Sequence, residues 1–230
     1  MSLKILNNFS HISEEYNLFN QNKLKCTKCS IYNHYKTVVS SEGNAKNPTF
    51  VFVGQSPGQD EVINGRPFIG KAGQKLRTEI KKHNIFNKNN TLITNLMPCR
   101  PKNNKFPKDS YAKEELNNNY EVYYNDRARI VDSKTVIKHC YNRWLHEELL
   151  ILKPKVVIVL GSDALEYVVE QKRISHFRGK WIPNTIYNCF IFATYHPSYV
   201  LRCQNDPSKQ NIVTDFEKDI ETIAKEYNLI

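Results

Sequence analysis

Two kinds of feature in this 230-residue sequence could carry chemistry: a spaced pair of cysteines and three short polar clusters. Cys26 and Cys29 have the C-x-x-C spacing that places two thiolates on one metal site. The polar clusters are Gly54–Gly58 (GQSPG), Asn95 and His196–Ser198 (HPS). Their amide, imidazole and hydroxyl groups donate and accept hydrogen bonds to polar ligands. Each group is common by itself, so what matters is whether the fold brings the clusters together.

Each polar cluster lies at the end of a segment with the composition of a buried β-strand. Thr49–Val53 (TFVFV), Thr91–Leu96 (TLITNL) and Asn188–Thr194 (NCFIFAT) are short, mainly apolar runs. Lys155–Leu160 (KVVIVL) is the clearest buried strand of the sequence. It runs into Gly161-Ser162-Asp163, which is typical of a helix start. The sequence therefore predicts four strands.

Helical segments alternate with these strands. The expected helices are Lys71–His83, Tyr141–Leu152, the segment after Gly161, and Asp215–Tyr227. This alternation predicts an α/β fold, a three-layer sandwich with a central, mostly parallel four-stranded sheet flanked by helices. Because such sheets bind ligands beyond the carboxyl ends of their strands, we expect the three polar clusters to converge on one active site.

We expect one domain over residues 1–230, with an insertion at about residues 103–134. A chain of this length with 40% hydrophobic residues can bury one sizeable core. The stretch Asn103–Lys134 is rich in Asn, Tyr and Lys and has little periodicity, which indicates an inserted lobe or long loop. Met1–Phe19 lacks the pattern of a secretion signal, and no apolar run reaches membrane-spanning length. We therefore expect an intracellular protein with no membrane partner.

The net charge indicates what kind of partner the protein binds, and the cysteine content indicates what the cysteines do. A formal net charge of +10 favours a polyanionic partner, because each phosphate contact releases condensed counterions. Solubility alone, or an AT-rich genome that prefers Lys and Asn codons, would give the same excess of positive charge. Inside a cell, the six cysteines are expected to be metal ligands or core residues rather than disulfides.

Read together and in order, the motifs around the polar clusters resemble the family 4 uracil-DNA glycosylases. Gly54–Gly70, here called the first motif, is similar to the family pattern G-E-x-P-G, an acidic cluster and G-R-P-F-V-G. Ile93–Pro101 resembles I-T-N-x-x-K-C-R-P, Arg178–Trp181 resembles R-G-x-W, and Thr194–Arg202 resembles T-Y-H-P-x-x-x-L-R. The match runs from about Leu24 to Arg202. The resemblance implies a monofunctional hydrolase that flips uracil, or a related pyrimidine, out of DNA and hydrolyses its N-glycosidic bond in base excision repair.

The resemblance also implies a [4Fe–4S] cluster. By position, its four ligands would be Cys26, Cys29, Cys99 and Cys140. Four thiolates suit zinc as well as an iron–sulfur cluster, so the preference for the cluster comes from the resemblance. Cys99 and Cys140 are further apart than in the family, and residues 103–134 account for the excess. We expect Cys189 to be a packed core thiol, and Cys203 has no assigned role.

Five residues of the matched motifs are expected to bind the flipped base: Gly54, Gln55, Phe68, Asn95 and His196. The resemblance implies that Phe68 stacks on the base. The amide of Asn95 offers a donor and an acceptor that match the O4 and N3–H edge of uracil. The resemblance further implies that His196 hydrogen-bonds uracil O2 and stabilises the leaving anion.

The first motif departs from the family at Gln55, where the family usually has a carboxylate. A neutral amide can position water but cannot accept its proton or supply full negative charge. Gln55, Asp60, Glu61 and His196 are the predicted catalytic residues, with Asp60 or Glu61 as the source of negative charge. Three possibilities follow: a slow uracil glycosylase, a glycosylase for a modified pyrimidine, or a catalytically weak or inactive DNA-binding or regulatory protein.

The remaining matched residues are expected to contact DNA. Arg178, Gly179, Lys180, Ser198 and Arg202 are predicted phosphate contacts, and Leu201 is the predicted wedge that fills the vacated stack. The expected partner is therefore double- or single-stranded DNA that contains uracil, and we expect the protein to act as a monomer.

Overall fold

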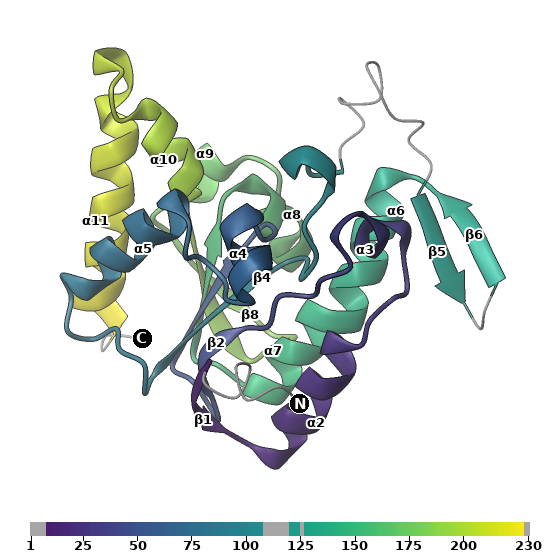
Figure 1. Cartoon of the computed structure of the whole chain (residues 1–230). Coiled ribbons are helices and arrows are strands. Elements are labelled where there is room, and N and C mark those ends of the chain that lie inside the picture. Colours follow the sequence, from purple (N-terminus) through teal and green to yellow (C-terminus); the bar gives the residue numbers. More distant parts are fainter. Residues whose placement is uncertain (1–7, 108–119, 125–126, 228–230) are drawn as a thin grey trace.

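A seven-stranded sheet forms the centre of the computed structural model, which describes residues 8–107, 120–124 and 127–227 (Figure 1). Its strand order is β1-β2-β4-β3-β7-β9-β8. The strands are β1 (Phe9–Ile12), β2 (Glu42–Ala45), β3 (Phe50–Gly54), β4 (Thr91–Asn95), β7 (Val156–Leu160), β8 (Trp181–Asn184) and β9 (Cys189–Thr194).

The four predicted strands are the four central ones, β4-β3-β7-β9, and every pairing among them is parallel. The prediction of a mostly parallel sheet is confirmed, whereas the expected number of four strands is too low. The three additional strands lie at the edges: β2 pairs antiparallel with β4, β1 pairs with β2, and β8 pairs antiparallel with β9. None of the three is a continuous apolar run: β1 (FSHI) contains Ser and His, β2 (EGNA) contains Gly and Asn, and β8 (WIPN) contains Pro and Asn. Pro is tolerated in an edge strand such as β8.

Helices cover both faces of the sheet, so the predicted three-layer sandwich is confirmed (Figure 1). The helices on one face are α5 (Lys71–Lys81), α10 (Pro197–Cys203) and α11 (Gln210–Glu226). Those on the other face include α2 (Glu14–Leu24), α7 (Glu147–Leu152) and α8 (Ser162–Val169). Successive strand residues point to opposite faces, so Phe50 and Phe52 join one hydrophobic cluster while Val51 and Val53 join the other.

The predicted helix at residues 141–152 is the end of a longer helical segment. This segment comprises α6 (Ser133–Cys140), a π-helical part η3 (Tyr141–His146) and α7. Asp132 begins it as an N-cap, where its side chain accepts a hydrogen bond from the Thr135 N–H at 2.7 Å. The other two bounded predictions correspond to α5 and to α11, and α11 begins five residues earlier than expected. The predicted helix after Gly161 is α8.

The expected insertion contains a β-hairpin of β5 (Tyr120–Tyr124) and β6 (Arg127–Val131); residues 108–119 and 125–126 lie outside the described chain. The hairpin packs on the loop that carries the first two cysteines. Val122 is fully buried and forms a β-bridge with Cys29, and the Tyr123 N–H donates to the Lys28 carbonyl at 3.0 Å. A single domain and an insertion at this place stay predictions.

Shorter elements complete the described chain: α3 (Ser30–Tyr35), α4 (Gln59–Asn64), α9 (Ile174–Phe177), η1 (Lys102–Asn104) and η4 (Pro207–Lys209). None of the described helices has both the length and the apolar character needed to cross a membrane.

Candidate active site and cysteine cluster

A cleft of about 1070 Å³ opens at the carboxyl ends of the central strands. Gln55 follows β3, Asn95 ends β4 and His196 follows β9, and all three line this cleft. The polar clusters therefore converge at one edge of the sheet, as the alternation of strands and helices predicts. Phe68 lines the same cleft from the loop before α5.

Gly54 allows Phe68 and Asn95 to pack closely against the end of β3. A Cβ atom at position 54 would lie 2.3 Å from Cζ of Phe68 and 2.6 Å from Oδ1 of Asn95. Phe68 itself has a left-handed φ of 53°, which a bulky residue rarely adopts. Two neighbours hold it there: Gly73 packs against its carbonyl group, and Nε of Arg77 donates to that carbonyl at 2.8 Å. The backbone of Phe68 is therefore held on two sides, while its ring is buried and packs against Gly54.

Asn95 carries a polar atom that the folded protein does not satisfy. Its side chain is buried, with 7% of its surface exposed. Among the residues that the structure describes, Oδ1 of Asn95 has no hydrogen-bond partner. A buried acceptor without a donor costs free energy, on the order of 1–3 kcal/mol. An atom of this kind on a cleft wall is suited to accept a hydrogen bond from a bound ligand.

His196 is held as a neutral imidazole with a defined tautomer. It is the N-cap of α10, and its Nδ1 accepts a hydrogen bond from the Ser198 N–H at 3.1 Å. Because Nδ1 accepts, the proton lies on Nε2. Burial lowers the pKa of His196 to about 4, with Asp163 acting to raise it and Arg202 to lower it. The ring lies 6.1 Å from that of Phe68, measured between centroids.

Gln55 contacts a carboxylate that was not among the predicted site residues. Nε2 of Gln55 donates a hydrogen bond to Oδ2 of Asp163. Asp163 is the second residue of α8 and, like Gln55, lines the cleft. Its sequence signal is present but ambiguous, since a Gly-Ser-Asp segment after a strand is also an ordinary helix start.

The two predicted acidic residues of the first motif have different surroundings. Glu61 is buried, and its carboxylate accepts hydrogen bonds from the backbone N–H groups of Gly58, Ile69 and Gly70 at 2.9 to 3.0 Å. These bonds engage both carboxylate oxygens and hold the two ends of the first motif together. Asp60 is exposed on the cleft wall. The catalytic roles of Asp60 and Glu61 stay predictions.

Three of the four predicted metal ligands, Cys29, Cys99 and Cys140, belong to one hydrophobic cluster, and the half-buried Cys26 packs against it. Cys26 and Cys29 come from the segment between α2 and α3, Cys99 follows β4, and Cys140 ends α6. Burial raises the pKa of Cys99 and Cys140, and each of these pKa values is raised further by Cys26 and Cys29. The thiols are therefore close enough to influence one another. Within the described ranges, no group of three or more His, Cys, Asp or Glu side chains is arranged to hold a metal ion.

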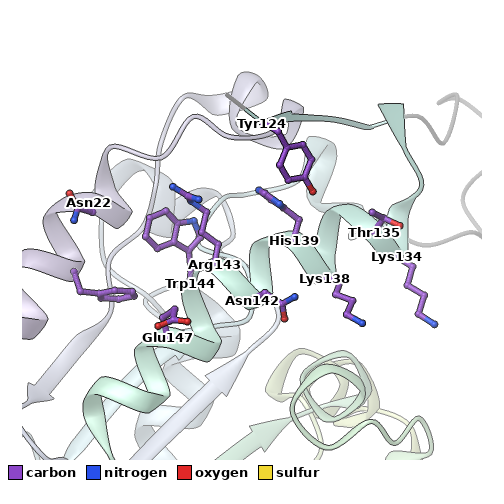
Figure 2. A pocket seen from close by; sticks show the side chains of 11 residues that line it. Asn22, Tyr124, Lys134, Thr135, Lys138, His139, Asn142, Arg143, Trp144 and Glu147 are labelled. Carbon is purple, nitrogen blue, oxygen red and sulfur yellow. The ribbon is translucent and has the colours of Figure 1, made fainter. Parts of the chain in front are cut away.

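A second cleft, of about 960 Å³, lies along α6 and η3 (Figure 2). Trp144 separates it from the thiols: the indole is 6% exposed, and its Nε1 donates to Sγ of Cys26 at 3.3 Å. Arg143 lies over this indole, with Cζ 5.1 Å from the ring centroid, and the rings of Tyr124 and His139 lie next to each other in an edge-to-face contact (Figure 2). None of the predicted site residues lines this second cleft.

The family model for the uracil DNA glycosylase superfamily matches residues 40–219. The chain belongs to this superfamily. Its sequence is 30% identical to the type-4 uracil-DNA glycosylase of Thermotoga maritima over 203 residues, which cover 88% of this chain and 91% of that protein. It is 29% identical to the type-4 uracil-DNA glycosylases of Saccharolobus solfataricus and Archaeoglobus fulgidus, with 87% and 88% of this chain covered and 82% and 90% of those proteins.

In this member of the uracil-DNA glycosylase superfamily, the predicted DNA contacts fall into two groups. Gly179, Lys180 and Arg202 are exposed, and Leu201 is half-buried on α10. Arg178 instead pairs with Asp215 and Asp219 of α11.

Ser198 is also engaged within the protein, because its Oγ lies 2.8 Å from Nδ1 of His196. All six DNA contacts stay predictions, and for Arg178 and Ser198 the contacts within the protein give a structural reason for the residue type.

The remaining cysteines of this superfamily member are core residues. Cys189 is 8% exposed within the cluster on the cysteine side, as expected, and Cys203 is 2% exposed in the opposite cluster.

Proposed function

We propose that this chain is a monofunctional uracil-DNA glycosylase of base excision repair. The observation that carries the proposal is the buried Oδ1 of Asn95, which has no hydrogen-bond partner among the described residues, next to the buried ring of Phe68. Uracil presents N3–H to such an acceptor, while O4 accepts from the Asn95 amide nitrogen. Cytosine has an unprotonated N3, which would leave two acceptors facing each other. The cleft therefore favours uracil over the normal base that it arises from.

In the proposed reaction, water and a deoxyuridine in DNA give an abasic site and free uracil. The C1′–N1 bond breaks with its electron pair on the base, and the water oxygen bonds C1′. His196 donates from Nε2 to O2 of the base as negative charge develops there. Since Ser198 fixes the tautomer, this donor is aligned before the reaction begins and needs no reorganisation.

We propose that Cys26, Cys29, Cys99 and Cys140 hold a [4Fe–4S] cluster, with zinc as the alternative. What supports the proposal is the chemistry of the donors: four thiols from three distant segments, in or against one hydrophobic cluster, suit either group. Burial keeps such thiols protonated, so a bound cation supplies the positive charge that makes them thiolates. The role is structural: the site ties the α2–α3 segment to the residues after β4 and to the end of α6.

DNA that contains uracil is the proposed partner. Arg202 is an exposed cation of the cleft lining, Lys180 is also exposed, and the chain carries a net charge of +10. The proposed activity requires the protein to act in the compartment that holds the DNA.

The test is release of free uracil from labelled single- and double-stranded oligonucleotides by protein with a filled cysteine site. We expect release by the wild type and a loss of about 100-fold or more in kcat for Asn95→Ala, with little loss of DNA binding. No release by the wild type at high enzyme excess would contradict the proposal.

A non-catalytic DNA-binding or regulatory protein is the second candidate, and the neutral side chain at Gln55 is the observation that favours it. This alternative predicts tight, salt-sensitive DNA binding without base release. It also predicts that Asn95→Ala changes nothing except the affinity for DNA.

A further inference from the structure

Asp163 lies on the wall of the active-site cleft, directly beside the position at which the first motif departs from its family pattern. β3 and β7 are parallel neighbours in the sheet, so the turns that follow them lie side by side. One turn carries Gln55, and the other carries Asp163 at the start of α8. The hydrogen bond from Nε2 of Gln55 to Oδ2 of Asp163 joins the two turns.

The same carboxylate acts on His196. Gly161, which precedes α8, packs so closely that a Cβ atom there would lie 2.9 Å from Cβ of His196. The negative charge of Asp163 raises the pKa of His196, against the larger effect of burial. Asp163 therefore interacts with the residue expected to position water and with the residue expected to stabilise the leaving base.

Asp163 is also the acidic side chain best placed to supply negative charge in the cleft. In the described part of the chain, the acidic residues that line it are Asp60, Glu61 and Asp163. Both oxygens of Glu61 are engaged by backbone N–H groups, and Asp60 is exposed to solvent, which screens its charge. Asp163 is half-buried and in contact with Gln55, where a charge is screened less.

We propose that Asp163 supplies the negative charge that position 55 lacks and acts as the positioning residue for Gln55; this rests on the proposed glycosylase function. The carboxylate accepts from Nε2, which turns the amide oxygen of Gln55 away from Asp163 and makes it the acceptor for the attacking water. The negative charge of Asp163 stabilises the positive charge that develops on the sugar in the transition state. Gln55 takes up no proton: the water releases its proton to solvent, and the departing base anion takes one up.

The first test is the variant Asp163→Asn, which removes the charge and keeps the shape. We expect kcat for uracil release to fall about 100-fold while KM changes little, because the charge acts only in the transition state. Glu166→Gln is the matched control, since it removes the same charge one turn further along α8, where Glu166 pairs with Lys172 at 3.2 Å. This control should keep wild-type kinetics.

The second test exchanges the two groups. Gln55→Glu alone places two carboxylates in contact, so one of them stays protonated and kcat does not rise. Gln55→Glu combined with Asp163→Asn restores one amide and one carboxylate in the reverse order. We expect kcat of this double variant to recover at least tenfold over Asp163→Asn alone. A residue that merely starts α8 would give no such rescue.

The third test does not depend on activity. In a titration followed by NMR, the pKa of His196 should be lower in Asp163→Asn than in the wild type. The proposal is overturned if the wild type releases uracil and Asp163→Asn keeps full kcat, or if the pKa of His196 does not move. A wild type that releases no uracil contradicts the proposed function instead and, with it, the role of Asp163 in catalysis.

Discussion

At the scale of single residues, the neutral state of His196 makes both the stability of the fold and the alignment of the cleft depend on pH. Burial places the pKa of the folded ring at about 4, below the ordinary value of 6.5. Between these values the unfolded chain binds more protons than the folded one, so the contribution of His196 to stability falls as the pH drops from 6.5 toward 4 and then stops changing. Protonation also removes the acceptor that Ser198 uses, which disturbs the alignment of Nε2.

We therefore expect kcat/KM for uracil release to show no loss from His196 between pH 8 and pH 5 and to fall at lower pH with a midpoint near 4. The measurement is a pH–rate profile made alongside the NMR titration of the same ring. His176→Gln is the control, since His176 is exposed and outside the cleft lining. An acid limb that follows a His196 midpoint near 6.5 would mean that the ring is not held neutral by burial.

At the scale of elements, a buried ion pair joins α2 to α7. Lys23 and Glu148 are 1% and 0% exposed, and Nζ lies 2.9 Å from Oε2. Ser41 and Thr94 donate to the same carboxylate, so Glu148 also connects the helices to the sheet. Glu148→Ala leaves Lys23 buried without its partner, and we expect it to lower the free energy of unfolding by about 3–5 kcal/mol.

Urea denaturation measures this loss. Lys225→Ala, which removes an exposed partner of Glu221, is the control and should change little. A Glu148→Ala protein as stable as the control would show that the pair contributes nothing.

The sequence predicts a helix or strand well where a pattern of buried apolar residues determines it. It predicts an element poorly where contacts with distant parts of the chain determine it. The four central strands are continuous apolar runs, because both of their faces are covered. β2 (EGNA) and α2 (EEYNLFNQNKL) have no such pattern, since their pairing and packing come from the rest of the fold. Phe68, Asn95 and His196 lie in recognisable motifs, whereas Asp163 gains its significance only from the pairing of β3 with β7. Sequence separation hides that contact.

At the scale of the whole molecule, the cysteine cluster joins three segments of the chain. If the four cysteines hold the proposed iron–sulfur cluster, Cys140→Ser should lose most of that cluster and the brown colour that it gives, and should unfold at lower temperature, because a bound metal stabilises the fold that creates its site. Iron, sulfide and zinc analysis with thermal denaturation tests this. Cys189→Ala is the control, since Cys189 is buried in the same hydrophobic cluster without being a predicted ligand. Full metal content in Cys140→Ser would exclude Cys140 as a ligand.

The order of residues along the chain also sets the order in which the parts of the two sites are synthesised. All four clustered thiols, together with Phe68 and Asn95, belong to the first 140 residues, whereas Asp163 and His196 follow later. During synthesis, the ribosome therefore makes every proposed metal ligand, together with Phe68 and Asn95, before it makes Asp163 and His196. A growing chain therefore contains all four cysteines of the proposed metal site while its cleft still lacks β7 and β9. The residues of the proposed reaction are complete only during translation of the last third of the chain.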